Sequence, residues 1–206
     1  MDGLKNTLII TAGALVIGVV IGSLVAMIKY CGQDSRLLRP LCWLCSVYTT
    51  VIRGVPVVVQ LLIFYFLILK SSDGLVVGIV TFGINSGAYV AELVRSGIAA
   101  VDPGQMEAGR SLGLNYITTM VVIIIPQAIR AVLPALGNEF IVLLKDTSLI
   151  TVIGGKELLY AAQGIMNRTY EPMFPLFGVA LMYLILVMIF TWLLAKFERR
   201  LAQSDR

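Results

Sequence analysis

Residues 7–28 read TLIITAGALVIGVVIGSLVAMI, without a charged side chain. A helix that crosses a membrane takes about 20 residues, so this stretch is long enough for one span. The whole chain shares its character: 58% of the 206 residues are hydrophobic and 14% are charged, with a mean hydropathy of +0.91. Because soluble domains carry about 25% charged residues, this composition excludes a water-soluble globular domain and a disordered chain. We expect a protein of the lipid bilayer.

Four more apolar stretches follow, and together they predict an all-α transmembrane fold with five membrane-spanning helices. They are residues 40–69, 75–94, 117–144 and 173–195. The first of these four is too long for one upright span and contains Pro56, so we expect a tilted helix bent at this proline. Residues 1–206 then form a single transmembrane domain, without room for a soluble domain of about 100 residues.

Small residues recur at four-residue spacing on two of the predicted spans. They are Ala14, Gly18, Gly22 and Ala26 on the first, and Gly83 and Gly87 on the third. Such residues let helix backbones approach closely, which matters because lipid gives helices no hydrophobic reason to associate. We expect them to pack helices within the chain.

Lysine and arginine favour one side of the membrane. With the N-terminus outside, the inside segments hold Lys29, Arg36, Arg39, Arg95, Arg110, Lys196, Arg199, Arg200 and Arg206. The outside segments hold Lys5, Lys70, Lys145, Lys156 and Arg168. Cytoplasmic loops carry an excess of these residues, so we expect an outside N-terminus and an inside C-terminus. The net charge of +4 has the same origin, and we expect no nucleic-acid partner.

The residue types argue against an enzyme. The chain has no histidine, which removes Ser-His-Asp chemistry and His-ligated metal sites. The run Gly154-Gly155-Lys156 lacks the spacing of a phosphate-binding loop. Cys42 and Cys45 stand at C-x-x-C spacing on an apolar stretch, where we expect structural cysteines. Any ATP that this protein uses must be hydrolysed by another chain.

Residues 102–113 (DPGQMEAGRSLG) predict a short helix between the third and fourth spans. Asp102 suits the N-cap, Pro103 the first helical position, and Gln105 completes an Asp-x-x-Gln capping box. Gly113 suits the positive φ of a C-terminal cap. A helix of about ten residues is too short to span a membrane and needs a docking surface. The alternative is an amphipathic helix that lies on the membrane.

This segment resembles the "EAA" signature of ABC importer permeases. Glu107-Ala108-Gly109 is followed at the family's spacing by Gly113, Ile123 and Pro126. Gly109 stands where the family usually has Ala, and Ile125 where it usually has Leu. Three further motifs, RGVP at 53–56, INSGAYVAE at 84–92 and LKDTSL at 144–149, resemble the subfamily that imports polar amino acids.

The resemblance implies a permease subunit of a bacterial inner membrane that pairs with a second subunit, identical or paralogous, to form a translocation path by alternating access. A separate ATP-binding cassette subunit would bind ATP and Mg²⁺, and this chain would hold no cofactor. An extracytoplasmic binding protein would deliver the amino acid. The residues expected to couple to the ATPase are Gln105, Glu107, Ala108, Gly109, Arg110 and Gly113.

Polar residues on the third span ask for a reason, because ionisable groups at membrane depth are costly. Asn85, Tyr89, Glu92 and Ser96 fall on one helical face. We expect Asn85, Ser86 and Tyr89 to line the substrate path, with hydrogen bonds between helices as the alternative. For Glu92 we expect an ion pair with Arg95 or Arg53.

A second polar group follows Pro134 and Gly137, which predict a loosened helix. Its candidate substrate contacts are Asn138, Glu139, Asp146, Thr147 and Ser148. Glu139 and Asp146 share a face if the helix continues. Lys145-Asp146-Thr147-Ser148 is expected to close the helix near the outer surface, and the alternative to substrate contact is that Thr147 and Ser148 cap a following turn.

Glu139 is also a departure from the small or neutral residue that the subfamily commonly carries, and it predicts selection of a cationic amino acid such as arginine, lysine or histidine. The alternative is an internal pair with Arg130. Two other functions stay open. One is an ion-coupled carrier or channel that uses Glu92 and Glu139 without an ATPase. The other is a membrane-embedded enzyme, whose nucleophile would lack a histidine base.

Overall fold

The computed structural model describes residues 2–32, 37–70 and 72–203, and every regular element within these ranges is a helix. In chain order the elements are α1 (Asp2–Cys31), α2 (Arg39–Gly54), α3 (Val57–Ile63), the π-helix η1 (Phe64–Ile68), α4 (Gly74–Ala99), α5 (Gly104–Ser111), α6 (Tyr116–Thr119), the π-helix η2 (Met120–Ile124), α7 (Ile125–Asp146), the 3-10 helix η3 (Thr147–Ile153), α8 (Leu158–Thr169) and α9 (Met173–Gln203).

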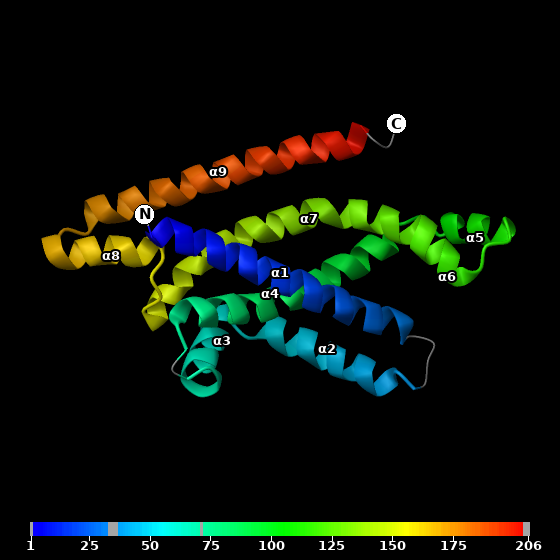
Figure 1. Ribbon diagram of the computed structural model, residues 1–206, viewed down its shortest axis with the longest axis horizontal. Coiled ribbons are helices and arrows are strands. Elements are labelled where there is room, and N and C mark those ends of the chain that lie inside the picture. The colour runs from blue at the N-terminus through cyan, green and yellow to red at the C-terminus, as the bar shows by residue number, and fades with distance from the viewer. Residues whose placement is uncertain (1, 33–36, 71, 204–206) are drawn as a thin grey trace.

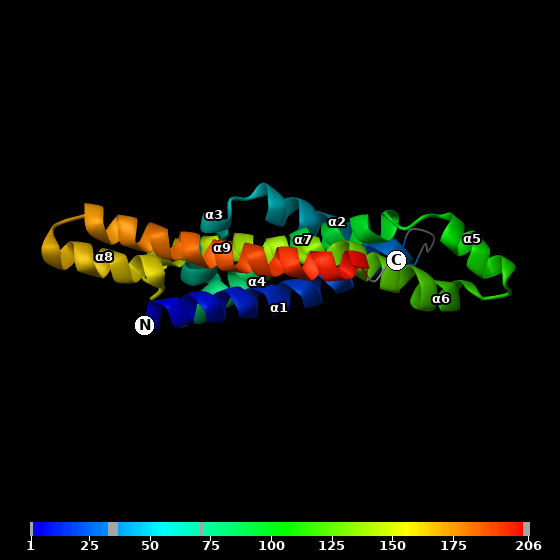
Figure 2. The same ribbon diagram turned by 90° about the horizontal axis from the view of Figure 1, so that it is seen from above.

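The long helices run along one direction of an elongated molecule. In Figure 1, α1, α4, α7 and α9 follow the long axis, and α5 and α8 lie at opposite ends. Seen from above, α5 and α6 project beyond the long helices at one end (Figure 2). Within the described ranges, four helical stretches are long and apolar enough to cross a membrane, and a fifth span is obtained when α2 and the stretch 57–68 count as one. The all-helical, multi-span fold is thereby confirmed.

The second span is sharply bent and consists of two helices. The stretch Arg39–Gly54 meets Val57–Ile68 at 107°, so the predicted bend at Pro56 is confirmed, and the expectation of one tilted helix is wrong. Proline has no N–H for the helix ladder, and the preceding residue is pushed toward extended backbone. Val55 is indeed extended, with ψ of 131°. Gln60 stabilises the break, since its Nε2 donates to the carbonyl oxygens of Ile52 at 2.7 Å and Val55 at 2.8 Å.

The fourth span is continuous where a loosened helix was predicted. Pro134 lies inside α7, which runs without interruption from Ile125 to Asp146, so the helix does not unwind before Asn138 and Glu139. The irregular turns lie at its two ends instead, as η2 before it and η3 after it. The third span also extends past its predicted end at Val94, because α4 continues to Ala99.

The contact between α1 and α4 is built on small residues, as predicted. Gly18 and Gly22 of α1 are buried, as are Ala14 and Ala26 beside them. A Cβ at Gly18 would lie 2.8 Å from the Ser86 hydroxyl, and one at Gly22 would lie 2.6 Å from the Cβ of Val90. Glycine therefore sets the distance between the two backbones.

Helix α9 is largely uncovered by the rest of the chain, in contrast to the helices around the core. Only 6% of the most apolar stretch of α9 is buried, and this helix contacts α7 and α8. The main hydrophobic core lies where α1, α4, the stretch 57–68 and η3 meet, around Ile10, Leu61, Phe82 and Ile150. An exposed apolar helix of this length is stable in lipid and not in water.

The α1–α4 contact makes a first prediction. The substitution Gly22→Ala places a methyl group against Val90, so we expect it to destabilise the chain by about 1–3 kcal/mol. The control Gly178→Ala, on α9, meets nothing within 4 Å and is expected to be neutral or slightly stabilising. Thermal unfolding of both variants in the same detergent measures the difference. Equal melting temperatures would show that the two backbones separate at no cost.

Candidate functional site

A carboxylate on α7 meets a hydroxyl on α4 at membrane depth. The Ser86 Oγ donates a hydrogen bond of 2.7 Å to Oε1 of Glu139. Ser86 is fully buried against Gly18 of α1, and Glu139 is half-buried. The α1–α4 contact therefore fixes the hydroxyl, and the hydroxyl orients the carboxylate. Ser86 reaches a substrate only through Glu139 or after a rearrangement, because its own side chain is enclosed.

A second carboxylate shares the face of Glu139. Asp146 lies seven residues further along the uninterrupted α7, which returns it to the same side of the helix. It is half-buried. The ion pairs within residues 2–32, 37–70 and 72–203 both involve Glu92, so the alternative of an internal pair between Glu139 and Arg130 is not found among them. Two acidic side chains therefore lie on one face of α7, and the basic Lys145 stands next to the second in the chain.

The other predicted contacts on α4 are divided between the interior and the surface. The Asn85 Nδ2 donates to Oε1 of Gln60 at 3.2 Å, which ties this residue to the broken span. Tyr89 is 39% exposed, and the guanidinium of Arg53 lies 5.2 Å from the centre of its ring. Tyr89 is thus the residue of this group that a solute can reach directly, with a cation held over its ring.

Asn138, Thr147 and Ser148 occupy different environments. Asn138 is exposed and Thr147 is fully buried. The hydroxyls of Thr147 and Ser148 each donate, at 2.8 Å, to a carbonyl oxygen of the preceding helix, at Leu144 and Lys145 respectively. The helix ends at this segment, as expected, and the two hydroxyls bond to α7 rather than capping the turn that follows. Thr147 is withdrawn from solvent in this conformation.

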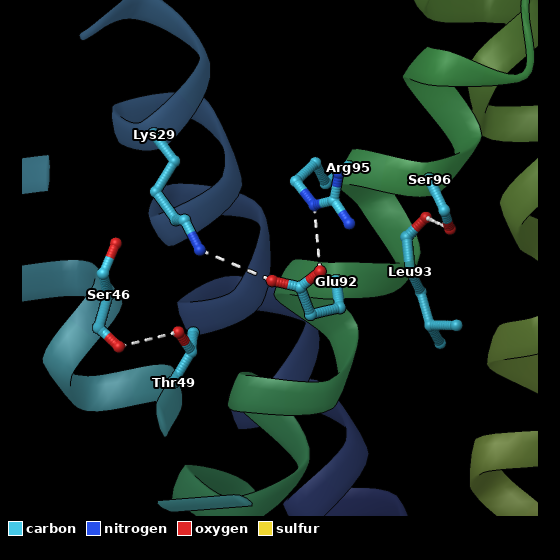
Figure 3. A network of polar contacts seen from close by, with 7 residues as sticks. All are labelled: Lys29, Ser46, Thr49, Glu92, Leu93, Arg95 and Ser96. Carbon is cyan, nitrogen blue, oxygen red and sulfur yellow. Dashed lines mark hydrogen bonds and ion pairs between the residues drawn. The ribbon is translucent and has the colours of Figure 1, made fainter. Parts of the chain in front are cut away.

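Glu92 forms the predicted ion pair with Arg95 and a further one with α1. Its Oε2 lies 2.9 Å from Nε of Arg95, and its Oε1 lies 3.4 Å from Nζ of Lys29. Figure 3 shows these three side chains converging from α1 and α4, with Ser46 of α2 nearby. The alternative partner Arg53 stacks on Tyr89 instead. This network joins α1 to α4 near the end at which α5 lies.

The short helix is present with narrower bounds than predicted. It spans Gly104–Ser111, with Pro103 at the N-cap position. Asp102 accepts from the N–H of Gly104 at 2.8 Å, so it closes a turn one residue before the cap. Gln105 does not complete a capping box, because its Oε1 accepts from Nε2 of Gln127 at 3.4 Å.

Gly113 ends this helix as predicted. Its φ is +84°, and its N–H donates to the carbonyl oxygen of Arg110 at 3.0 Å. The N–H of Leu114 donates to that of Gly109 at 3.1 Å. This pair of bonds is a Schellman motif, which needs a left-handed residue at the glycine position.

The faces of α5 separate its predicted coupling residues. Gln105, Glu107, Ala108 and Arg110 are exposed. Gly109 is buried in the chain itself, and a Cβ there would lie 2.6 Å from Cγ2 of Thr119. The small size of Gly109 is therefore required by packing on α6, and its predicted place against another protein is wrong for this conformation. The exposed side chains leave one face of α5 open to a partner.

Two buried polar residues were not predicted from the sequence. Gln60 is 4% exposed, and the sequence signal is that it is the one polar side chain within residues 57–69. Glu157 is fully buried, accepts from the N–H of Tyr160 at 2.7 Å and receives the hydroxyl of Tyr183. It fixes the start of α8 to α9. The sequence offers little signal for this cap, because glutamate is not among the residues that N-caps prefer.

Comparison with known families and sequences gives a consistent result. The family model described as "Binding-protein-dependent transport system inner membrane component" matches residues 18–203. The arginine transport system permease protein of Bacillus subtilis strain 168 is 36% identical over 100% of this chain and 93% of its own length. The glutamine transport system permease protein of Escherichia coli strain K12 is 36% identical over 98% of this chain and 92% of its own.

Solved structures agree with this result. A crystal structure of an amino acid ABC transporter with histidines contains a chain that superposes with a TM-score of 0.90 at 43% identity, covering 97% of this chain and 92% of that one. An inward-facing methionine ABC transporter gives a TM-score of 0.81 at 20% identity, covering 97% and 94%. The second likeness concerns the fold alone.

The cap of α5 makes a second prediction. Gly113→Val forces a β-branched residue to a positive φ, which costs about 1–2 kcal/mol. We expect faster hydrogen exchange of the amides of residues 104–111 and unchanged exchange in α1 and α4. In Gly164→Val, the matched control, the new side chain meets open space, so α5 should keep its protection. Unchanged protection of α5 in Gly113→Val would contradict the Schellman cap.

Proposed function

The chain belongs to the family of inner membrane components of binding-protein-dependent transport systems, and we propose from this premise that it conducts cationic amino acids. Its relatives are permease subunits of amino acid transport systems, and its structural neighbours are ABC importers. It is a permease subunit of an ATP-driven amino acid importer and a multi-pass protein of the inner membrane. The choice among polar amino acids and the identity of the contact residues belong to the proposal.

The observation that carries the proposal is the half-buried carboxylate of Glu139. Its hydrogen-bond donor is the neutral hydroxyl of Ser86, and Asp146 is a second acidic group on the same helix face. A carboxylate at membrane depth is costly without a cation. The ammonium or guanidinium of a passing amino acid supplies that cation through a charge-assisted hydrogen bond.

The names of the relatives support a polar amino acid as substrate, either cationic or neutral. One is named for arginine and another for glutamine, while the transporter at 43% identity was crystallised with histidines. The carboxylates on α7 favour the cationic choice. Tyr89, with Arg53 over its ring, is the contact that we assign to the carboxyl end of the amino acid, since it brings a positive charge to an accessible face of α4.

We assign the exposed face of α5 to a separate ATP-binding cassette subunit. Glu107 and Arg110 lie on this face, and the chain has no phosphate-binding loop of its own. ATP and Mg²⁺ then bind to the partner, and hydrolysis takes place there. A second permease subunit and an extracytoplasmic binding protein complete the assembly. With α5 in the cytoplasm, the N-terminus lies outside and the C-terminus inside, in line with the distribution of Lys and Arg.

Transport follows because ATP binding to the partner favours one of two conformations of the transporter over the other. ATP on the partner stabilises one position of α5, and the spans move between inward-open and outward-open arrangements. The alternative carrier or channel would use Glu92 and Glu139 without an ATPase. Glu92 is already engaged by Lys29 and Arg95, and the relatives and neighbours described above are subunits of transport systems rather than independent carriers.

The third prediction tests the substrate. In vesicles with the complete transporter, Glu139→Gln should lower arginine uptake by about ten- to a hundredfold, because it removes a charge-assisted hydrogen bond of about 1.5–3 kcal/mol. Assembly and basal ATP hydrolysis should not change. Glu171→Gln makes the same chemical change at an exposed position between α8 and α9 and serves as the control. Unchanged arginine uptake, or a native preference for glutamine, would refute cationic selectivity.

The fourth prediction tests the coupling face. Glu107→Lys reverses a charge on the exposed face of α5, and we expect at least about a tenfold loss of uptake and less ATPase subunit copurifying with the chain, because a mispaired interface charge costs about 2–5 kcal/mol. Glu171→Lys, at the opposite end of the molecule, should leave both unchanged. Normal copurification with Glu107→Lys would assign the ATPase contact to another surface.

A further inference from the structure

We propose that the chain binds one anionic phospholipid where α1, α2 and α4 meet, with the lipid phosphate held by Lys29 and Arg95. This site lies outside the proposed substrate path and serves a different ligand. The evidence consists of the charges around Glu92, a pocket beside them and the position of this pocket at the helix ends.

The charges are unbalanced in favour of an anion. Glu92 is shared by Lys29 and Arg95, so the three side chains together carry one positive charge. Arg95 uses only its Nε for this contact, which leaves the terminal amino groups of its planar guanidinium as donors. Its side chain is 56% exposed. A lipid phosphodiester carries one negative charge and therefore matches the surplus.

A pocket of about 250 Å³ lies directly beside these donors. Its lining residues are Ala26, Lys29, Tyr30, Gly32, Cys42, Ser46, Arg95 and Ile98. Three helices contribute, and the Ser46 side chain adds a hydroxyl donor of the kind that phosphate oxygens accept. Figure 3 shows Lys29, Ser46 and Arg95 arranged around Glu92.

The pocket lies at the depth at which a lipid headgroup lies, near the ends of the helices that line it. Lys29 lies in the last turn of α1, Arg95 in the second-last turn of α4, and Cys42 in the first turn of α2. All three are thus at helix ends, which is where a spanning helix leaves the hydrocarbon region. Basic pockets between spanning helices are known to hold anionic headgroups.

An apolar groove of about 370 Å³ lies between α1, α4 and α7. Ile98 lines both cavities. The groove continues along α1 and α4 toward the membrane interior, past Val19, Ser23 and Met27, and α7 forms its other wall. In Figure 1, α1 and α4 cross and then diverge toward this end. The place of the pocket at the ends of spanning helices, beside their apolar surfaces, favours a lipid over a free phosphate.

The test measures lipid binding to the purified full-length chain in neutral detergent. Native mass spectrometry during a titration gives the affinity for the first bound dioleoyl phosphatidylglycerol. We expect one tight site for this lipid and at least about tenfold weaker binding of dioleoyl phosphatidylcholine, which has the same acyl chains. Inorganic phosphate at matched concentration should not displace the lipid. Equal binding of the two lipids would refute the site, and displacement by phosphate would assign the pocket to a free anion.

Variants separate a lipid site from a purely structural ion pair. Arg95→Gln should weaken phosphatidylglycerol binding about fivefold, since one basic residue near the headgroup contributes about that factor. Glu92→Gln raises the net charge of the cluster and should strengthen binding about fivefold, although it removes both ion pairs and lowers the melting temperature. A structural role alone predicts the lower melting temperature without tighter binding, and that outcome would overturn the proposal.

Arg39→Gln is the matched control for charge. Arg39 is exposed at the start of α2 and does not line the pocket, so its loss should leave the affinity unchanged. If Arg39→Gln weakens binding as much as Arg95→Gln, the attraction is diffuse and the site is refuted. If Glu92→Gln does not fold, the comparison of Lys29→Gln and Arg95→Gln with Arg39→Gln decides the question.

Discussion

The close contact between α1 and α4 is the constraint on which the rest of the structure depends. Glycines at 18 and 22 bring the two backbones together where lipid offers no hydrophobic force. Ser86 is buried by this contact, and its hydroxyl can then reach Glu139 on α7. The same two helices bring Lys29 and Arg95 to one carboxylate further along. A wider separation would remove the hydroxyl donor of Glu139 and the basic pocket together.

Much of the fold follows from local physics that the sequence displays. The apolar runs fix the spans because each needs about 20 residues, and the positive φ at Gly113 follows from the absence of a side chain there. The broken second span was harder to predict. Pro56 indicates a disturbance, but its angle depends on Gln60, whose amide donates to carbonyls on the other side of the break. At Pro134 the predicted loosening of the helix is absent, since α7 tolerates this proline within a continuous helix.

The residue types of the site were easier to predict from the sequence than the contacts that these residues make. Glu139 and Glu92 are conspicuous as charges within apolar stretches, and each has a specific partner in the structure. Which partner it has depends on residues distant in sequence, such as Lys29 for Glu92 and Ser86 for Glu139. Gly109 shows the limit most clearly. Its spacing identifies the motif correctly, but spacing says nothing about whether the small residue accommodates another protein or, as here, a neighbouring helix of the same chain.

The burial of Gly109 has a mechanical consequence. The contact with Thr119 attaches α5 to α6, and α6 continues through η2 into the uninterrupted α7. A displacement of α5 therefore reaches α6 through this packing contact as well as through the connecting chain. Because α6, η2 and α7 follow one another without a connecting loop, and α7 carries Glu139, the packing of one glycine links the exposed short helix to that distant carboxylate.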